Sequence, residues 1–207
     1  MSTLLVVAVV GSVSAFPTRS GDSRLVDRQP RFVHYYEPNP YEPNPYRPCE
    51  RRGFRRDLQL TARTIQQTNN TLTIMKQDLF RGVFPTFADF EEDGGQLVHL
   101  FRNLSRYELT IPNVILEAQE LNDYSATLRQ AMHDTGEYLN KLLFKLGFTL
   151  RAAGDLEDQS WTADSMSLPD PEGSLYWHYV RDVTFFQHLY GALEQLKAEL
   201  EARLAEC

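Results

Sequence analysis

The sequence predicts an all-α fold, a four-helix bundle preceded by a proline-rich arm. From residue 54 onward the apolar residues recur every three or four positions, which is the period of an amphipathic helix. No segment alternates apolar and polar residues as a half-buried strand does. The chain has 207 residues and is 42% hydrophobic, enough for one core. We therefore expect a single helical domain over residues 53–207.

The first two helices follow from apolar spacing and from the breakers between them. A first helix is predicted over about 54–80, because one stripe repeats every seven residues: Leu58, Ile65, Leu72 and Leu79. Residues 81–95 contain Pro85 and an acidic run, which predicts a long connection. A short helix is expected from 97 to about 109, and Pro112 ends it or starts the next.

The third and fourth helices fill the rest of the chain. From Val114 to Leu146 the apolar positions alternate spacings of four and three, which predicts one long helix. It would exceed about 50 Å, so a break is expected near 134–137, where Asp134 can cap a new start. Residues 154–173 form another long connection, and the last helix runs from residue 174 to the end.

The connections are long, short and long, which predicts an up-up-down-down bundle with two crossover loops. Two parallel neighbours need a connection that returns the length of the bundle. A simple antiparallel bundle with two long loops is the alternative. Either topology places the start of the first helix near the end of the last.

The N-terminus predicts a signal peptide over residues 1–15. Leu4 to Val10 are uninterrupted Leu, Val and Ala, and Val13 and Ala15 suit a cleavage site before Phe16. The run is shorter than the roughly 20 residues that a membrane anchor needs. We expect a secreted, extracellular protein without stable membrane insertion; a buried N-terminal helix is the alternative.

Residues 16–52 are expected to be a disordered arm. They contain the tandem repeat Tyr-Glu-Pro-Asn-Pro and few aliphatic residues. Residues 16–56 hold nine Arg against five acids, so the net charge of -7 leaves -11 for residues 57–207. The pairs Arg51-Arg52 and Arg55-Arg56 are interpreted either as processing sites or as solvated charge.

Composition and motifs argue against catalysis and against nucleic acid as a partner. A chain with a net charge of -7 is not expected to have the broad basic surface that neutralises phosphates. Two cysteines exclude a four-thiolate metal site, and the five histidines form no metal-binding pair. The sequence has neither a nucleophile elbow nor a phosphate-binding loop. We predict a monomer that is not an enzyme and holds neither metal nor cofactor.

Two kinds of covalent modification are predicted for a secreted chain. Cys49 and Cys207 are expected to form a disulfide joining the two ends of the bundle, with free or intermolecular thiols as the alternative. Asn69 and Asn103 stand in glycosylation sequons. We expect Asn103 to face solvent and Asn69 to lie on the apolar stripe of its helix.

The last helix carries the candidate binding residues. Trp177, Arg181 and Phe185 are four residues apart and far around the helix from the core residue Val183, which predicts an exposed ridge. Trp and Arg dominate binding hot spots. The alternative is that the 154–173 connection, with Trp161 and Met166, covers this ridge.

The segment Leu175-Tyr176-Trp177-His178-Tyr179-Val180-Arg181-Asp182 resembles the start of the last helix in helical cytokines of the interleukin-6 family, which includes leukaemia inhibitory factor and ciliary neurotrophic factor. The resemblance implies a ligand of a cell-surface cytokine receptor, with Tyr176, Trp177, Arg181 and Phe185 in the receptor-binding surface. That family typically has Phe-x-x-Lys here. Tyr176 falls on the Phe position and Tyr179 on the Lys position, so the charge is absent.

Two alternatives to this function remain. Trp177-His178-Tyr179-Val180-Arg181 also resembles the Trp-x-x-Val-Arg of type I interferons, although the usual Cys before the Trp is missing. Long Leu-striped helices also make exchangeable carriers of lipid or other hydrophobic ligands. Binding to liposomes separates such a carrier from a receptor ligand.

Overall fold

The structure is a computed structural model that describes residues 50–82, 96–121, 123–156, 164–168 and 174–207. These residues form four helices and no strand: α1 (Arg51–Asp78), α2 (Leu97–Glu120), α3 (Ala126–Ala153) and α4 (Leu175–Glu206). The predicted all-α class is confirmed. The signal peptide and nearly all of the proline-rich arm, which were predicted from the sequence, lie outside the described residues.

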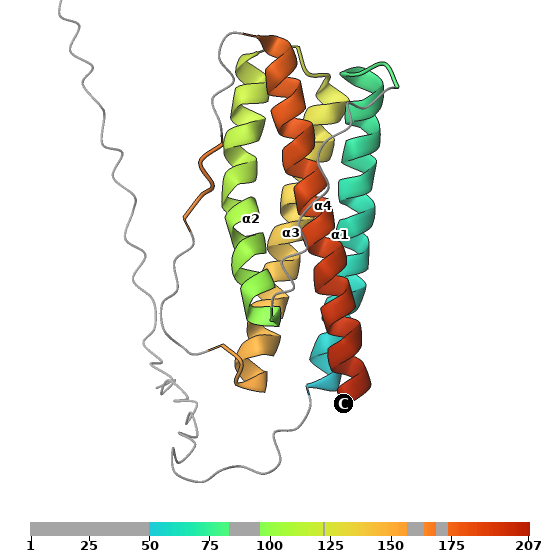
Figure 1. Cartoon of the computed structure of the whole chain (residues 1–207), viewed down its shortest axis with the longest axis vertical. Helices are drawn as coiled ribbons and strands as arrows, with labels where there is room; N and C mark the ends of the chain where they lie inside the picture. Colours follow the sequence, from blue (N-terminus) through green and yellow to red (C-terminus); the bar gives the residue numbers. More distant parts are fainter. Residues whose placement is uncertain (1–49, 83–95, 122, 157–163, 169–173) are drawn as a thin grey trace, which may run out of the picture. The chain divides into compact units, whose positions relative to one another are not determined.

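The four helices pack so that each contacts two others. α1 packs against α3 and α4, and α2 packs against the same two helices. Within the described residues α1 does not contact α2, and α3 does not contact α4 (Figure 1). These two pairs therefore lie diagonally across the domain.

Side-chain contacts show which helix ends lie together. At the upper pole in Figure 1, Ser125 donates a hydrogen bond of 2.5 Å to Asp78, and Arg181 pairs with Glu117 at 2.6 Å. The ends of α1 and α2 thus lie beside the starts of α3 and α4. At the lower pole the Arg203 guanidinium lies 6.0 Å from the centre of the Phe54 ring and 3.1 Å from Asp155. The start of α1 thus lies beside the end of α4.

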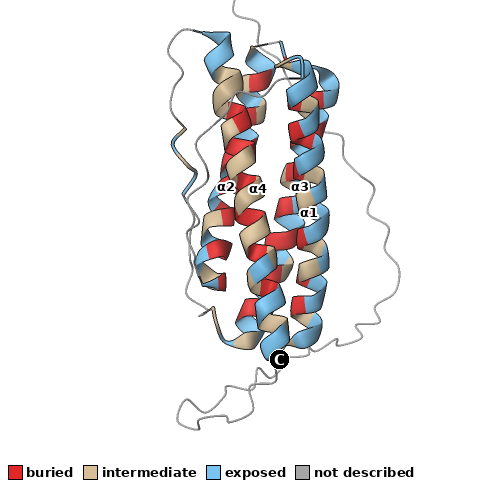
Figure 2. Cartoon of the chain, turned by 45° about the vertical axis from the view of Figure 1, so that its right-hand side comes forward, coloured by how far each residue is buried: buried red, intermediate tan, exposed pale blue. Residues whose placement is uncertain are grey.

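Buried residues gather on the sides of the helices that face one another (Figure 2). On α1 these are mostly threonines rather than the predicted leucine stripe, of which Leu58, Ile65 and Leu79 are only half-buried. The buried residues of α1 are Phe54, Asp57, Thr61, Thr64, Thr68, Thr71, Leu72 and Met75. The predicted orientation of this helix was therefore wrong.

The threonines can be buried because their hydroxyl groups are satisfied within their own helix. Thr61 donates to the carbonyl of Asp57 at 2.8 Å, and Thr68 donates to that of Thr64 at 2.9 Å. Thr71 also lies 2.9 Å from the hydroxyl of Thr135 on α3. A buried polar group costs little once it is hydrogen-bonded. Small polar side chains therefore let α1 and α3 approach closely.

The boundary between the second and third helices differs from the prediction. α2 continues through Pro112 to Glu120, and α3 begins at Ala126 and passes through 134–137 without a break. Pro112 is exposed, so the carbonyl that loses its helical donor lies on the solvent side. Ser125 caps α3 by accepting the N–H of Leu128 at 3.0 Å.

Gly136 has a packing role instead of breaking the helix. A Cβ atom at this position would lie 3.1 Å from Cγ2 of Ile111 on α2. This is closer than ordinary van der Waals contact, so the glycine allows α3 to approach α2.

Asp57 is a buried carboxyl group at the lower pole. It has no exposed surface, and neither side-chain oxygen has a hydrogen-bond partner. The nearby Thr149 hydroxyl donates to the carbonyl of Lys145 at 3.2 Å. Burial raises the pKa of Asp57, against weaker opposing effects of Thr149, Arg56 and Lys145. The ionised carboxylate therefore destabilises the fold.

Replacing Asp57 with asparagine should raise the free energy of unfolding at pH 7 by about 1 to 2 kcal/mol. Because the folded-state pKa is raised above the unfolded value of 3.8, the folded state binds more protons between these two pKa values. The wild type then loses stability as the pH rises through this window, and the gain from Asp57→Asn shrinks as the pH falls. Urea denaturation between pH 3 and 8 measures this difference. Glu120→Gln, at an exposed position, is the control, and a gain independent of pH would contradict the assignment.

Candidate receptor-binding surface

An exposed apolar surface lies at the upper pole, in the first turn of α4. It consists of three consecutive residues, Leu175, Tyr176 and Trp177, which are 38%, 50% and 54% exposed. We call it the α4 entry surface. Tyr176 and Trp177 are two of the four residues predicted to bind a receptor, and their rings lie 5.6 Å apart in an edge arrangement. An aromatic pair of this kind offers a large contact area in a fixed geometry.

The α4 entry surface rests on a layer of further aromatic rings. Phe80, just after α1, lies edge-on to Tyr176 at 6.2 Å and to Tyr179 at 6.4 Å. Tyr179 in turn lies 5.4 Å from the buried ring of Tyr124, just before α3. Rings from three parts of the chain therefore orient the exposed pair.

A buried polar network lies beside these rings and joins α4 to α2 and to Tyr124 just before α3. Arg181 donates two hydrogen bonds to one oxygen of Asp182, at 2.8 and 2.9 Å, and the Tyr124 hydroxyl donates to the other at 2.7 Å. Arg181 also forms its 2.6 Å ion pair with Glu117 of α2. The side chains of Arg181 and Asp182 are only 8% and 1% exposed. The network thus fixes the start of α4 to its neighbours.

The electrostatics of this network follow from its burial. Burial raises the pKa of Asp182, although Arg181 and the Tyr124 hydroxyl oppose that rise. Burial raises the pKa of Tyr124 as well, and the adjacent Asp182 carboxylate raises it further. Burial lowers the pKa of Arg181, but the charges and hydrogen bonds of Asp182 and Glu117 outweigh the effect of burial, so the pKa is raised overall. Arg181 is therefore a charged structural group.

The predicted exposed ridge of Trp177, Arg181 and Phe185 is wrong at two of its three positions. Trp177 is exposed, but Arg181 is enclosed by the network, and Phe185 is 3% exposed. The Phe185 ring lies 5.2 Å from Tyr107 of α2 and 5.4 Å from Phe186. α4 packs against α1 and α2 at once, so it buries more of its circumference than one apolar stripe.

Part of the connection between α3 and α4 also covers α2. The backbone N–H of Met166 donates to the Thr110 hydroxyl at 2.8 Å, and Met166 and Leu168 pack against the core. Thr110 lies one turn after Tyr107, which contacts Phe185. Met166 therefore lies against α2, whereas Trp161 lies outside the described residues, and a connection that covers the ridge stays a prediction.

The two sequons lie differently from the prediction. Asn69 is exposed and Asn103 is half-buried, so the expected contrast between them is wrong. The reason is the threonine face of α1, which turns Asn69 away from the core. Accessibility therefore does not favour glycosylation at Asn103 over Asn69.

The predicted disulfide joins Cys207 to a residue outside the described part of the chain, Cys49. Cys207 directly follows α4, and Glu50 directly precedes α1. The contact between Arg203 and Phe54 brings these two helix ends together. The pairing stays a prediction.

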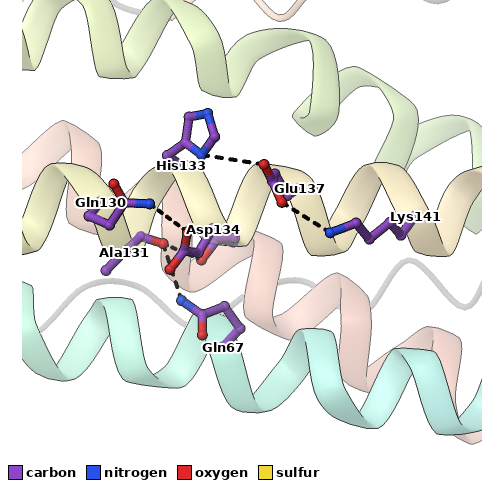
Figure 3. A network of polar contacts seen from close by, with 8 residues as sticks. Gln67, Gln130, Ala131, His133, Asp134, Glu137 and Lys141 are labelled. Atoms are coloured by element: carbon purple, nitrogen blue, oxygen red, sulfur yellow. Dashed lines mark hydrogen bonds and ion pairs between the residues drawn. The ribbon is translucent and has the colours of Figure 1, made fainter.

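A second surface, which the sequence did not indicate, lies between α2 and α3. It is an open groove of about 750 Å³ whose lining includes Ile111, Leu116, His133 and Asn140. Leu116 is 55% exposed. Figure 3 shows the α3 side of this region, where Glu137 pairs with Lys141 at 3.0 Å and with His133 at 3.9 Å. Apolar spacing identified no groove here, because it merged the two helices into one.

Two further properties concern the chemistry available to this domain. The described residues contain no group of three or more His, Cys, Asp or Glu side chains placed to hold a metal ion. Among the same residues, no helix has both the length and the hydropathy to cross a bilayer.

Comparison of the chain with protein-family models, curated proteins and solved structures found no match. The assignment of the candidate receptor-binding surface therefore rests on the geometry of the structure.

Proposed function

We propose that this protein is a secreted signalling ligand of the helical-cytokine type, which binds a cell-surface cytokine receptor through the α4 entry surface. The observation that carries this proposal is the exposed Tyr176–Trp177 pair, whose Tyr176 ring packs against Phe80 just after α1. Monomeric proteins tend to bury large aromatic side chains, and exposed clusters of them mark interaction sites.

The packing of the helices supports the same proposal. We infer an up-up-down-down bundle, in which each helix contacts only the two that run in the opposite direction. This inference is supported by the diagonal placement of α1 with α2 and of α3 with α4, and by the helix ends that lie together at each pole. Two long connections are what such a bundle needs.

The interleukin-6 family is the resemblance that we favour, with a changed specificity. Tyr179 stands where that family has a lysine, and its hydroxyl donates to Asp123. The position therefore presents neither a cation nor a free hydroxyl donor. The receptor that we propose must therefore recognise Tyr176 and Trp177 without a basic side chain beside them.

Replacing Trp177 with alanine should weaken receptor binding about thirtyfold, or about 2 kcal/mol, because a hot-spot ring would be lost. The thermal midpoint should change little, because the side chain is 54% exposed. Surface plasmon resonance against a panel of soluble cytokine-receptor ectodomains from the same organism measures the affinity. Circular dichroism on the same samples measures the midpoint.

Phe148→Ala is the matched control, because Phe148 is also aromatic and 51% exposed but lies in the last two turns of α3, which ends at the lower pole. Its affinity should equal that of the wild type. Equal affinity for Trp177→Ala would exclude the α4 entry surface. Failure of the wild type to bind any ectodomain, together with binding to neutral liposomes, would instead support the hydrophobic-ligand carrier.

A further inference from the structure

Four arginines crowd the first two turns of α1, as the pairs Arg51-Arg52 and Arg55-Arg56. All four are exposed. Among the residues that the structure describes, none of the four forms an ion pair. They are therefore available to an external anion.

This arrangement is unfavourable for helix α1 itself. The start of a helix is the positive end of its dipole, where acidic side chains stabilise and basic ones do not. α1 has no acidic residue in its first turn. Arg51 with Arg55, and Arg52 with Arg56, are also like charges four residues apart, which repel. Residues that break a local rule without a structural gain are expected at functional positions.

The positive charge continues from α1 onto α3. Gly53 lies against Thr149 of α3, where an added Cβ would come within 2.7 Å of Cγ2. Lys145 lies one helical turn before Thr149, whose hydroxyl donates to the carbonyl of Lys145, so Lys145 belongs to the same part of the α1–α3 contact. Arg56 and Lys145 both lower the pKa of Asp57, in agreement with this placement. Further along α1, Arg63 lines a shallow cleft of about 310 Å³ together with Tyr138 of α3.

We call Arg52, Arg56, Arg63 and Lys145 the basic stripe. On α1 it extends over about 16 Å, at 1.5 Å per residue. Two exposed aromatic rings lie near Lys145 on α3: Phe144 and Phe148 are 59% and 51% exposed, their rings are 4.9 Å apart, and the Lys145 ammonium lies 5.3 Å from the Phe144 ring. Lys141 adds little net charge, because Glu137 pairs with it (Figure 3).

We propose that the basic stripe binds a sulfated polysaccharide. An arginine fork matches the oxygens of a tetrahedral oxyanion, and several along one face suit a chain that repeats such groups. The stripe is local on a protein of net charge -7, which opposes long-range attraction to any polyanion, so binding depends on direct contacts along the stripe. It lies at the lower pole, whereas the α4 entry surface lies at the upper pole, so the two surfaces can bind independently.

The test is binding to heparin of defined length, measured by isothermal titration calorimetry at several salt concentrations. Arg52→Ala with Arg56→Ala should weaken binding about tenfold or more, the size expected for losing charge-assisted hydrogen bonds. The slope of log affinity against log salt concentration should fall by about 2, one for each lost contact. The control is Arg102→Ala with Arg106→Ala, an exposed pair with the same spacing on α2, which should bind like the wild type.

Two further arms identify the ligand. Desulfated heparin should not bind, and single-stranded RNA of equal charge should bind at least tenfold more weakly than heparin. Equal losses in the two arginine variants would overturn the proposal, and so would RNA binding as tight as heparin binding. Circular dichroism shows that each variant is folded. Trp177→Ala should leave heparin affinity unchanged, so this result is separable from the test of receptor binding.

Discussion

Replacing Arg181 with methionine should lower the free energy of unfolding by about 3 to 5 kcal/mol, because Asp182 would keep a buried carboxylate without its cation. Tyr124 would still donate one hydrogen bond to Asp182, but the two bonds from Arg181 would be lost. Urea denaturation at pH 7 measures the change. A second substitution, Asp182→Asn, should restore part of the stability, because it removes the uncompensated charge.

The matched control for Arg181 is Arg102→Met on α2, since Arg102 is exposed. This control should change stability by no more than about 0.5 kcal/mol. If Arg181→Met were equally mild, Arg181 would belong to a solvated ridge, as the sequence alone suggested, and not to a buried network.

The second large effect is expected at Phe185. Its ring fills space between Tyr107 and Phe186 and is 3% exposed, so Phe185→Ala should lower the free energy of unfolding by about 3 to 5 kcal/mol. Loss of receptor binding in this variant should follow only from unfolding, because the side chain does not reach the surface. Thermal and urea denaturation both measure the effect.

Phe148→Ala serves as the control for Phe185, because it removes the same ring from an exposed position of α3. It should cost less than about 1 kcal/mol. Similar losses for the two phenylalanine variants would show that Phe185 is not a core residue.

Helical period was enough to predict the class of the fold and most of its helices. It identified α1 and α4 closely, because long periodic segments bounded by Pro and Gly have few other solutions. It failed between α2 and α3, because the spacing of four and three continues unchanged from the end of α2 into the start of α3. Ser125 falls on this spacing of four and three, although its side chain caps the start of α3.

The candidate site was only partly predictable, for a different reason. Angles around a single helix place Trp177 and Phe185 on one ridge, but they do not tell how many neighbours that helix has. α4 contacts both α1 and α2, and this tertiary packing buries Phe185 and Arg181 while leaving Trp177 exposed. The threonine face of α1 was missed because threonine counts as polar, although its hydroxyl is satisfied by its own helix.

That threonine face has a consequence for how α1 and α3 are aligned. Groups no larger than a methyl or a hydroxyl meet across the contact, at Thr71 with Thr135 and at Gly53 with Thr149. Sliding α1 by about one helical turn, or four residues, would bring Asp57 to the place of Gly53 and Met75 to the place of Thr71, where only these small groups fit. The shape of the contact therefore fixes the longitudinal register of the two helices. A uniform leucine stripe would instead be compatible with several registers.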